Sequence, residues 1–165
     1  MDRIMSEVCV FLADGFEEIE GLTVVDLLRR AGIETKTVSV MGREEIQGAH
    51  GITVKADSLF EDTDFSEVRM LVLPGGMPGT THLKEHKELG ELILKYNEEK
   101  KYLAAICAAP TVFGGMGMLK GKKAICYPGM EKGLTGAEVT CQPVVTDGHI
   151  TTSRGLGTAI EFALA

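Results

Sequence analysis

Short apolar runs and longer amphipathic segments alternate along this chain. The runs at residues 8–13, 70–73 and 102–106 have the length and near-continuous hydrophobicity of strands that are buried on both faces of a parallel sheet. Residues 33–41, in which Thr and Val alternate, form a further predicted strand. Because helical segments separate these strands, the pattern predicts an α/β fold with a mostly parallel central sheet and helices on both faces.

The predicted helices differ in how clearly they end. Residues 17–30 carry three acids near their start and Arg29 and Arg30 at their end, as the helix dipole favours. Residues 85–100 form a charged amphipathic helix. The last helix, residues 158–165, ends without a glycine, a basic residue or a polar cap. We therefore interpret residues 1–165 as a single domain that lacks a C-terminal tail of the full protein.

The segments between these elements are shorter and more polar. The dipeptide Asp147-Gly148 predicts a β-hairpin within residues 144–153. The other assignments are a turn-rich stretch at 42–51, a short edge strand at 52–56, a surface connection at 57–67 and a strand at 122–127.

Composition narrows the range of partners. A net charge of -7, a pI near 5.1 and the lack of Trp argue against nucleic acid or an anionic membrane as the main partner. No apolar run is long enough to span a bilayer, and the N-terminus carries no signal-peptide pattern. We therefore expect a cytoplasmic protein.

The four cysteines have different surroundings. Their spacing matches no zinc-ligand pattern and includes no C-x-x-C pair, so we predict neither a metal site nor a disulfide framework. Cys9, Cys126 and Cys141 lie in or beside apolar, strand-like runs and are interpreted as structural. Only Cys107 stands where a buried strand meets a helix, because Pro110 belongs in a first helical turn.

A strand that turns into a helix at a cysteine is the pattern of a nucleophile elbow, which holds the side chain above the carboxyl edge of the sheet. The helix N-terminus favours the thiolate, so the pattern predicts a Cys107 pKa well below the usual value of about 8.5. It also predicts a sparsely populated backbone conformation at Cys107. The alternative is a buried cysteine that serves only as a small hydrophobic side chain.

A second loop follows the strand at residues 70–73. Its sequence, Pro-Gly-Gly-Met-Pro-Gly at residues 74–79, lets backbone N–H groups approach a ligand closely. It matches neither the Walker P-loop nor the dinucleotide-binding glycine pattern.

Four motifs together strongly resemble the ThiJ/PfpI superfamily, especially the branch of the parkinsonism-associated deglycase and its bacterial relatives. They are Ala-Asp-Gly-Phe-Glu-Glu-Ile-Glu20, Leu-Pro-Gly-Gly76, Ala-Ala-Ile-Cys107-Ala-Ala-Pro and Thr-Ser-Arg-Gly-Leu-Gly-Thr158. The resemblance covers the whole chain. It implies a single flavodoxin-like domain that pairs as a homodimer, using the first helix and the polar stretch after the second strand.

The resemblance also implies roles for individual residues. Cys107 would be a nucleophile of low pKa, and Glu20 would be a protonated acid that donates a hydrogen bond to its thiolate. The backbone N–H groups of Gly76 and Ala108 would bind an anion, and no cofactor is implied. The residues alone favour a different interpretation of Glu20, as one more solvated acid in the first turn of a helix.

The chain departs from the family pattern in two places. Family members often carry a His before a Pro shortly after the elbow helix, where this chain has Tyr127-Pro128. Ala108 stands where the protease-like branch has a His after the nucleophile, which argues against a peptidase. The four histidines lie in polar surroundings and are interpreted as surface residues: His50, His82, His86 and His149.

Two functions fit these residues. In the first, a glyoxalase or deglycase, Cys107 attacks the aldehyde of a small reactive dicarbonyl such as methylglyoxal, and Glu20 moves a proton. In the second, a redox sensor or stress-linked chaperone, Cys107 is oxidised to a sulfinate. A dimeric scaffold with an inert cysteine is a third, weaker interpretation.

Overall fold

A computed structural model describes residues 7–165, so the N-terminal stretch on which the signal-peptide analysis bears lies mostly outside the described residues. Its centre is a seven-stranded sheet with the order β10-β11-β7-β6-β1-β2-β5. The strands are β1 (Val8–Leu12), β2 (Thr35–Ser39), β5 (Ser58–Leu59), β6 (Met70–Leu73), β7 (Tyr102–Ile106), β10 (Val144–Asp147) and β11 (Ile150–Ser153). All neighbours are parallel except β10 and β11, which form the predicted hairpin. The predicted α/β fold is confirmed.

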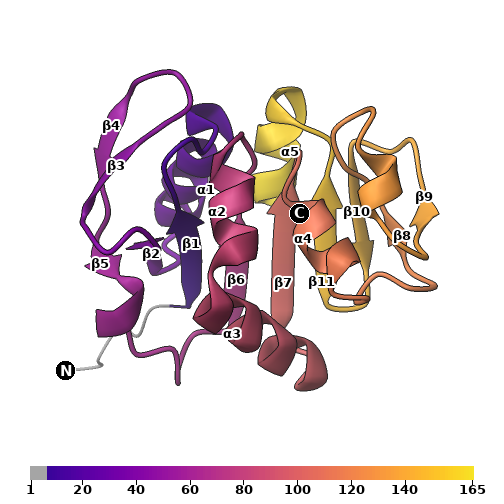
Figure 1. Ribbon diagram of the computed structural model, residues 1–165, viewed down its shortest axis with the longest axis horizontal. Helices are drawn as coiled ribbons and strands as arrows, with labels where there is room; N and C mark the ends of the chain where they lie inside the picture. Colours follow the sequence, from indigo (N-terminus) through magenta and orange to yellow (C-terminus); the bar gives the residue numbers. More distant parts are fainter. Residues whose placement is uncertain (1–6) are drawn as a thin grey trace.

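Helices cover both faces of this sheet (Figure 1). On one face lie α1 (Glu18–Arg30) and α5 (Ala159–Leu164), and on the other lie α2 (Gly79–Glu85), α3 (Lys87–Glu98) and α4 (Pro110–Gly115). Strand β1 shows how the sequence builds two cores, because its side chains alternate between the faces. Cys9 and Phe11 pack in the core beneath α2, α3 and α4, whereas Val10 and Leu12 pack in the core beneath α1 and α5.

One edge of the sheet differs from the prediction. Strands β3 (Glu45–Gln47) and β4 (Thr53–Lys55) form a separate antiparallel hairpin, so the segment predicted as an edge strand does not join the central sheet. The edge is instead β5, within the predicted surface connection. Phe60 and Phe65, which follow β5, pack their rings against Phe11. This aromatic cluster attaches the segment to the core.

The helix predicted at residues 85–100 begins two residues later in the structure, at Lys87. Two helices occupy the region, and they meet at His86, whose backbone is extended with ψ 103°. The His86 ring caps α3, because its Nδ1 accepts the Leu89 N–H at 3.0 Å. His86 is thus a partly buried structural residue rather than a surface one.

The predicted strand at residues 122–127 is much shorter in the structure. It is reduced to β8 (Lys123–Ala124), which pairs with β9 (Glu138–Val139) outside the central sheet. The next backbone N–H groups bind other partners: Ile125 donates to the Thr152 hydroxyl, and Tyr127 donates to the Cys107 carbonyl. After Ala124 the chain therefore no longer pairs with β9, and its backbone instead hydrogen bonds to β11 and to Cys107.

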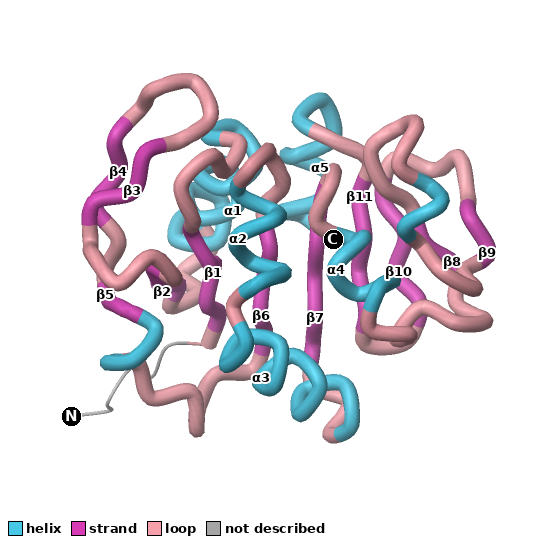
Figure 2. The backbone as a smooth tube through the Cα atoms, in the orientation of Figure 1, coloured by secondary structure: helices cyan, strands magenta, loops and turns pink. Residues whose placement is uncertain are grey.

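The parallel strands β1, β6 and β7 end at the same edge of the sheet, where loops replace them (Figure 2). Open α/β sheets place their ligand sites outside such carboxyl ends. No helix in residues 7–165 is both long enough and apolar enough to cross a membrane.

Candidate active site

Cys107 forms the turn between β7 and α4. Its φ of 65° lies in the left-handed region, which among the described residues only one other non-glycine residue shares. The predicted uncommon backbone conformation is confirmed, at a cost of about 1–2 kcal/mol. Two hydrogen bonds hold it: the Cys107 N–H donates to the Ser153 carbonyl at 3.0 Å, and the Cys107 carbonyl accepts the Tyr127 N–H at 2.7 Å.

The glycine loop after β6 packs directly against this turn. A Cβ on Gly75 would lie 2.6 Å from the Cys107 Cβ and 2.6 Å from the Glu20 Oε1, so no side chain fits there. Gly76 has φ +90°, and a Cβ on it would lie 2.3 Å from the Glu17 nitrogen. The absence of a side chain at both glycines therefore lets the loop after β6 approach the elbow and the start of α1 closely.

Backbone N–H groups surround the sulfur. Those of Gly76 and Ala108 lie close enough to the Cys107 sulfur to lower its pKa. The two donors come from different loops, one after β6 and one from the elbow itself, and they converge on one atom. Such an arrangement stabilises negative charge on the sulfur or on an atom bonded to it.

Glu20 reaches the same place from the first turn of α1. It is only 1% exposed, so the alternative of a solvated acid is wrong. Its Oε1 accepts the Gly75 N–H at 3.1 Å, and hydrogen bonding with Cys107 contributes to the pKa values of both groups. Its Oε2 is buried with no partner in good hydrogen-bonding geometry among residues 7–165. Burial without full pairing favours a protonated carboxyl group.

Burial raises the pKa of both groups. Burial, aided by the charge of Glu17 and opposed by hydrogen bonding with Cys107 and Gly75, raises the pKa of Glu20 to about 7. Burial, together with the charge and hydrogen bond of Glu20, raises the pKa of Cys107 to about 12, although the N–H groups of Ala108 and Gly76 lower it. The predicted lowering of the Cys107 pKa stays a prediction, because Cys107 and Glu20 titrate as a pair.

The two pKa values describe one pair of groups. Two adjacent anions repel each other, so the pair releases a first proton near pH 7 and a second only near pH 12. Between these values the pair holds one proton and one negative charge. That state combines a nucleophile with an acid.

The other cysteines lie elsewhere. Cys9 and Cys126 are buried, which fits their structural interpretation, but Cys141 is exposed. The apolar run beside Cys141 therefore misled the prediction for that residue.

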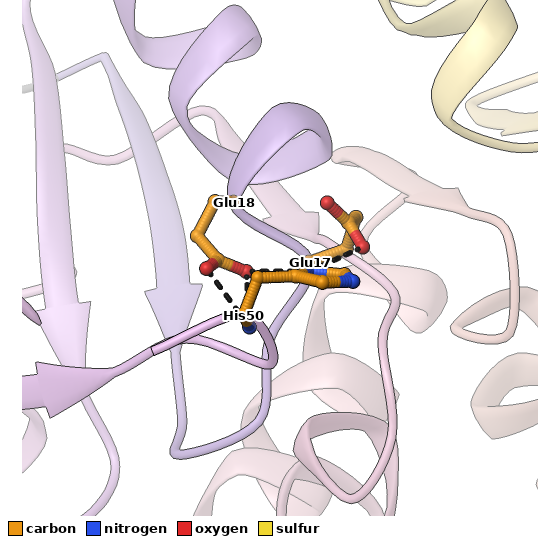
Figure 3. Close-up of side chains that lie close together, drawn as sticks. All are labelled: Glu17, Glu18 and His50. Atoms are coloured by element: carbon orange, nitrogen blue, oxygen red, sulfur yellow. Dashed lines mark hydrogen bonds and ion pairs between the residues drawn. The ribbon is translucent and has the colours of Figure 1, made fainter. Parts of the chain in front are cut away.

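A cluster that the sequence analysis missed lies at the N-terminus of α1 (Figure 3). The His50 Nδ1 is 3.4 Å from the Glu17 Oε2 and 3.3 Å from the Glu18 Oε1. Carboxylates and an imidazole could hold a divalent cation. However, Glu18 already accepts the backbone N–H groups of His50 at 2.9 Å and Ile52 at 3.4 Å. These bonds give the cluster a structural role, which is to fasten the loop between β3 and β4 to α1.

The sheet, the elbow and the buried acid define an α/β protein with a candidate nucleophilic cysteine. A family model described as the DJ-1/PfpI family matches residues 6–165. The chain belongs to this family, in agreement with the resemblance of its four motifs.

Similar proteins include homologues from plants and animals. The chain is 39% identical over 166 residues to the protein DJ-1 homolog B of Arabidopsis thaliana, a match that covers 99% of this chain and 38% of the plant protein. It is 37% identical over 157 residues to the protein dj-1beta of Drosophila melanogaster, covering 94% and 84%. The chain therefore spans less than half the length of the Arabidopsis protein.

Solved structures share the fold closely. The oxidized DJ-1 of Toxoplasma gondii superposes with a TM-score of 0.92 at 35% identity, covering 97% of this chain and 88% of that one. The Drosophila melanogaster DJ-1beta superposes with a TM-score of 0.90 at 36% identity and the same coverage.

Proposed function

We propose that this protein is a cofactor-independent glyoxalase or deglycase that acts on small α-oxoaldehydes, such as methylglyoxal, or on the adducts they form. One observation carries the proposal: Cys107 lies beside the buried carboxyl of Glu20, and the backbone N–H groups of Gly76 and Ala108 favour negative charge on its sulfur. The site thus combines a nucleophile, an acid and a stabiliser of negative charge.

The proton of the pair resides on Glu20 in the reactive form. Two backbone N–H groups, of Gly76 and Ala108, lower the pKa of the Cys107 sulfur, whereas the carboxyl group accepts one backbone N–H, that of Gly75. Stronger solvation by the backbone favours the charge on sulfur. The buried Oε2 of Glu20 lacks a donor, which suits an oxygen that carries the proton.

The reaction begins when the thiolate attacks the aldehyde carbon. The C–S bond forms as the carbonyl π electrons move to oxygen, and Glu20 protonates that oxygen to give a hemithioacetal. Glu20, now a carboxylate, removes the proton on C1 and delivers it to the C2 carbonyl oxygen, which gives an enediol. Transfer of the C1 hydroxyl proton to C2 forms a thioester. Water attacks C1 and releases the 2-hydroxy acid and Cys107, so methylglyoxal and water give lactate.

Lactate release from methylglyoxal tests this proposal. We expect Cys107→Ser and Glu20→Gln to lower kcat/KM by roughly 100-fold or more. Cys141→Ser, which alters an exposed cysteine, is the matched control and should keep full activity. Turnover by the unmodified protein no faster than by Cys107→Ser would refute the proposal.

Oxidation of Cys107 is a second candidate function. The same N–H groups would hold sulfinate oxygens, and one similar structure is that of an oxidized DJ-1. Two peroxide molecules would each transfer one oxygen to the sulfur and leave as water. Intact mass after mild peroxide treatment should show two added oxygens, lost in Cys107→Ser. Selective oxidation without dicarbonyl turnover would favour a sensor over an enzyme.

A further inference from the structure

Tyr127 lies beside the nucleophile, although it comes from a loop outside the central sheet. Its backbone N–H donates to the Cys107 carbonyl at 2.7 Å. The thiol of Cys126 contacts the Tyr127 carbonyl at 3.4 Å. These bonds fix the main chain of Tyr127 next to the elbow, so its side chain begins within the site region.

The ring of Tyr127 packs over the loop that follows β11. A Cβ on Gly155 would lie 3.5 Å from the ring Cδ2 and 4.0 Å from the ring Cε2, so the ring lies against the Gly155 backbone. The residue is nevertheless 51% exposed. Part of the ring is thus positioned by protein and part is open to a ligand.

Two further exposed apolar side chains adjoin the backbone of the site. Met77 follows Gly75 and Gly76 in the loop that packs against Cys107, and it is 55% exposed. Leu156 directly follows Gly155 and is 52% exposed. A single exposed apolar residue is ordinary. Here three loops each contribute one at the nucleophile's end of the sheet, and we call Met77, Tyr127 and Leu156 the apolar rim.

We propose that Tyr127 is a specificity-determining residue and that the apolar rim selects α-oxoaldehydes with an apolar, preferably aromatic, substituent. The inference rests on the proposed glyoxalase function and deepens it. A flat substituent next to the reacting carbonyl would cover the open part of the Tyr127 ring, which packs against Gly155. Aromatic pairing and burial of apolar surface would stabilise a bound aromatic substituent, whereas the methyl group of methylglyoxal offers little surface for such contact.

The first test compares kcat/KM for phenylglyoxal, which would yield mandelate, with that for methylglyoxal. We expect Tyr127→Ala to lower the phenylglyoxal-to-methylglyoxal ratio by about 10-fold relative to the unmodified protein, mainly through the KM for phenylglyoxal. Tyr127→Phe should keep the ratio, because the ring and not the hydroxyl recognises the substituent. Tyr102→Ala, which removes an exposed tyrosine at the start of β7, is the matched control and should leave the ratio unchanged.

A second test does not depend on turnover. The Cys107 alkylation rates with N-phenyl iodoacetamide and with iodoacetamide should show the same loss of aromatic preference in Tyr127→Ala. Should Tyr127→Ala fail to fold, as shown by thermal unfolding, Tyr127→His keeps a smaller ring and should lower both ratios. Equal ratios in the unmodified protein and the variants would overturn the inference. Loss of the alkylation preference in a protein that turns over neither dicarbonyl would refute the proposed function and keep the aromatic recognition.

Discussion

Gly75 approaches Cys107 so closely that a single methyl group on the glycine would lie 2.6 Å from the Cys107 Cβ. The same methyl group would lie 2.6 Å from the Glu20 Oε1. The missing side chain of Gly75 is therefore what allows the acid and the nucleophile to meet. One carbon atom added at residue 75 would therefore disturb the contact between Glu20 and Cys107.

We expect Gly75→Ala to lower the free energy of unfolding by about 1–3 kcal/mol, because the added carbon forces the elbow or α1 to move. It should also slow methylglyoxal turnover more than any change in stability explains. Urea unfolding and steady-state kinetics measure the two effects. Gly157→Ala is the control, because a Cβ there meets no atom within 4 Å. Equal behaviour of the two variants would contradict the packing argument.

The alkylation rate of Cys107 should rise with pH through a midpoint near 7. That is where the pair loses its first proton, and the proposed location of the remaining proton on Glu20 leaves the sulfur charged. Iodoacetamide kinetics between pH 5 and 10 measure the profile. A rate that stays low throughout that range would place the first lost proton on Glu20 instead, with the thiol intact.

The buried Glu20 should make stability depend on pH. The pair of Glu20 and Cys107 loses its first proton near pH 7, whereas a glutamate in the unfolded chain loses its proton near the ordinary value of 4.5. The folded protein therefore binds more protons between these values, and stability falls as pH rises. The penalty is absent below about pH 4.5 and complete above about pH 7. It amounts to roughly 3 kcal/mol, since each pKa unit corresponds to about 1.4 kcal/mol.

Glu20→Gln should therefore gain stability over the unmodified protein between pH 5 and pH 8, as measured by chemical denaturation at each pH. The exposed Glu91→Gln on α3 serves as control and should show no such trend. A stability difference that does not change with pH would mean that Glu20 is not the buried titrating group.

We expect two copies of the chain to pair through α1 and the hairpin of β3 and β4. Ile19 and Ile52, in these two segments, are 49% and 51% exposed. Ile52→Glu should give a monomer at micromolar concentration, because a charge at an apolar contact is costly to bury. Light scattering measures the mass, and Leu94→Glu on α3 is the control. A monomeric unmodified protein would contradict the expectation.

Local sequence was sufficient to predict the elbow. A buried run that ends at Ile106, followed by Pro110, determines both the strand and the helix, so the backbone of Cys107 follows from its immediate neighbours. Glu20 was different. Its burial depends on Gly75, 55 positions away, and without the family resemblance its sequence position suggests only a first-turn acid.

The errors in the predicted fold concern elements that leave little signal in the sequence. The break at His86 depends on an imidazole that caps α3, a less common choice than Ser, Thr, Asp or Asn. Strand β5 has only two residues and is held by β2 and by the rings of Phe60 and Phe65. Elements that short carry almost no periodic signal.

The hydrogen bond from the Cys107 N–H to the Ser153 carbonyl has a consequence for protein synthesis. Ser153 and Tyr127 both follow Cys107 in the chain, so β11 emerges from a ribosome after β7 and the elbow. A nascent chain that has already exposed Cys107 still lacks two of the contacts that form the elbow. The left-handed backbone of Cys107 is therefore held by both hydrogen bonds only after β11 has been synthesised and has joined the sheet.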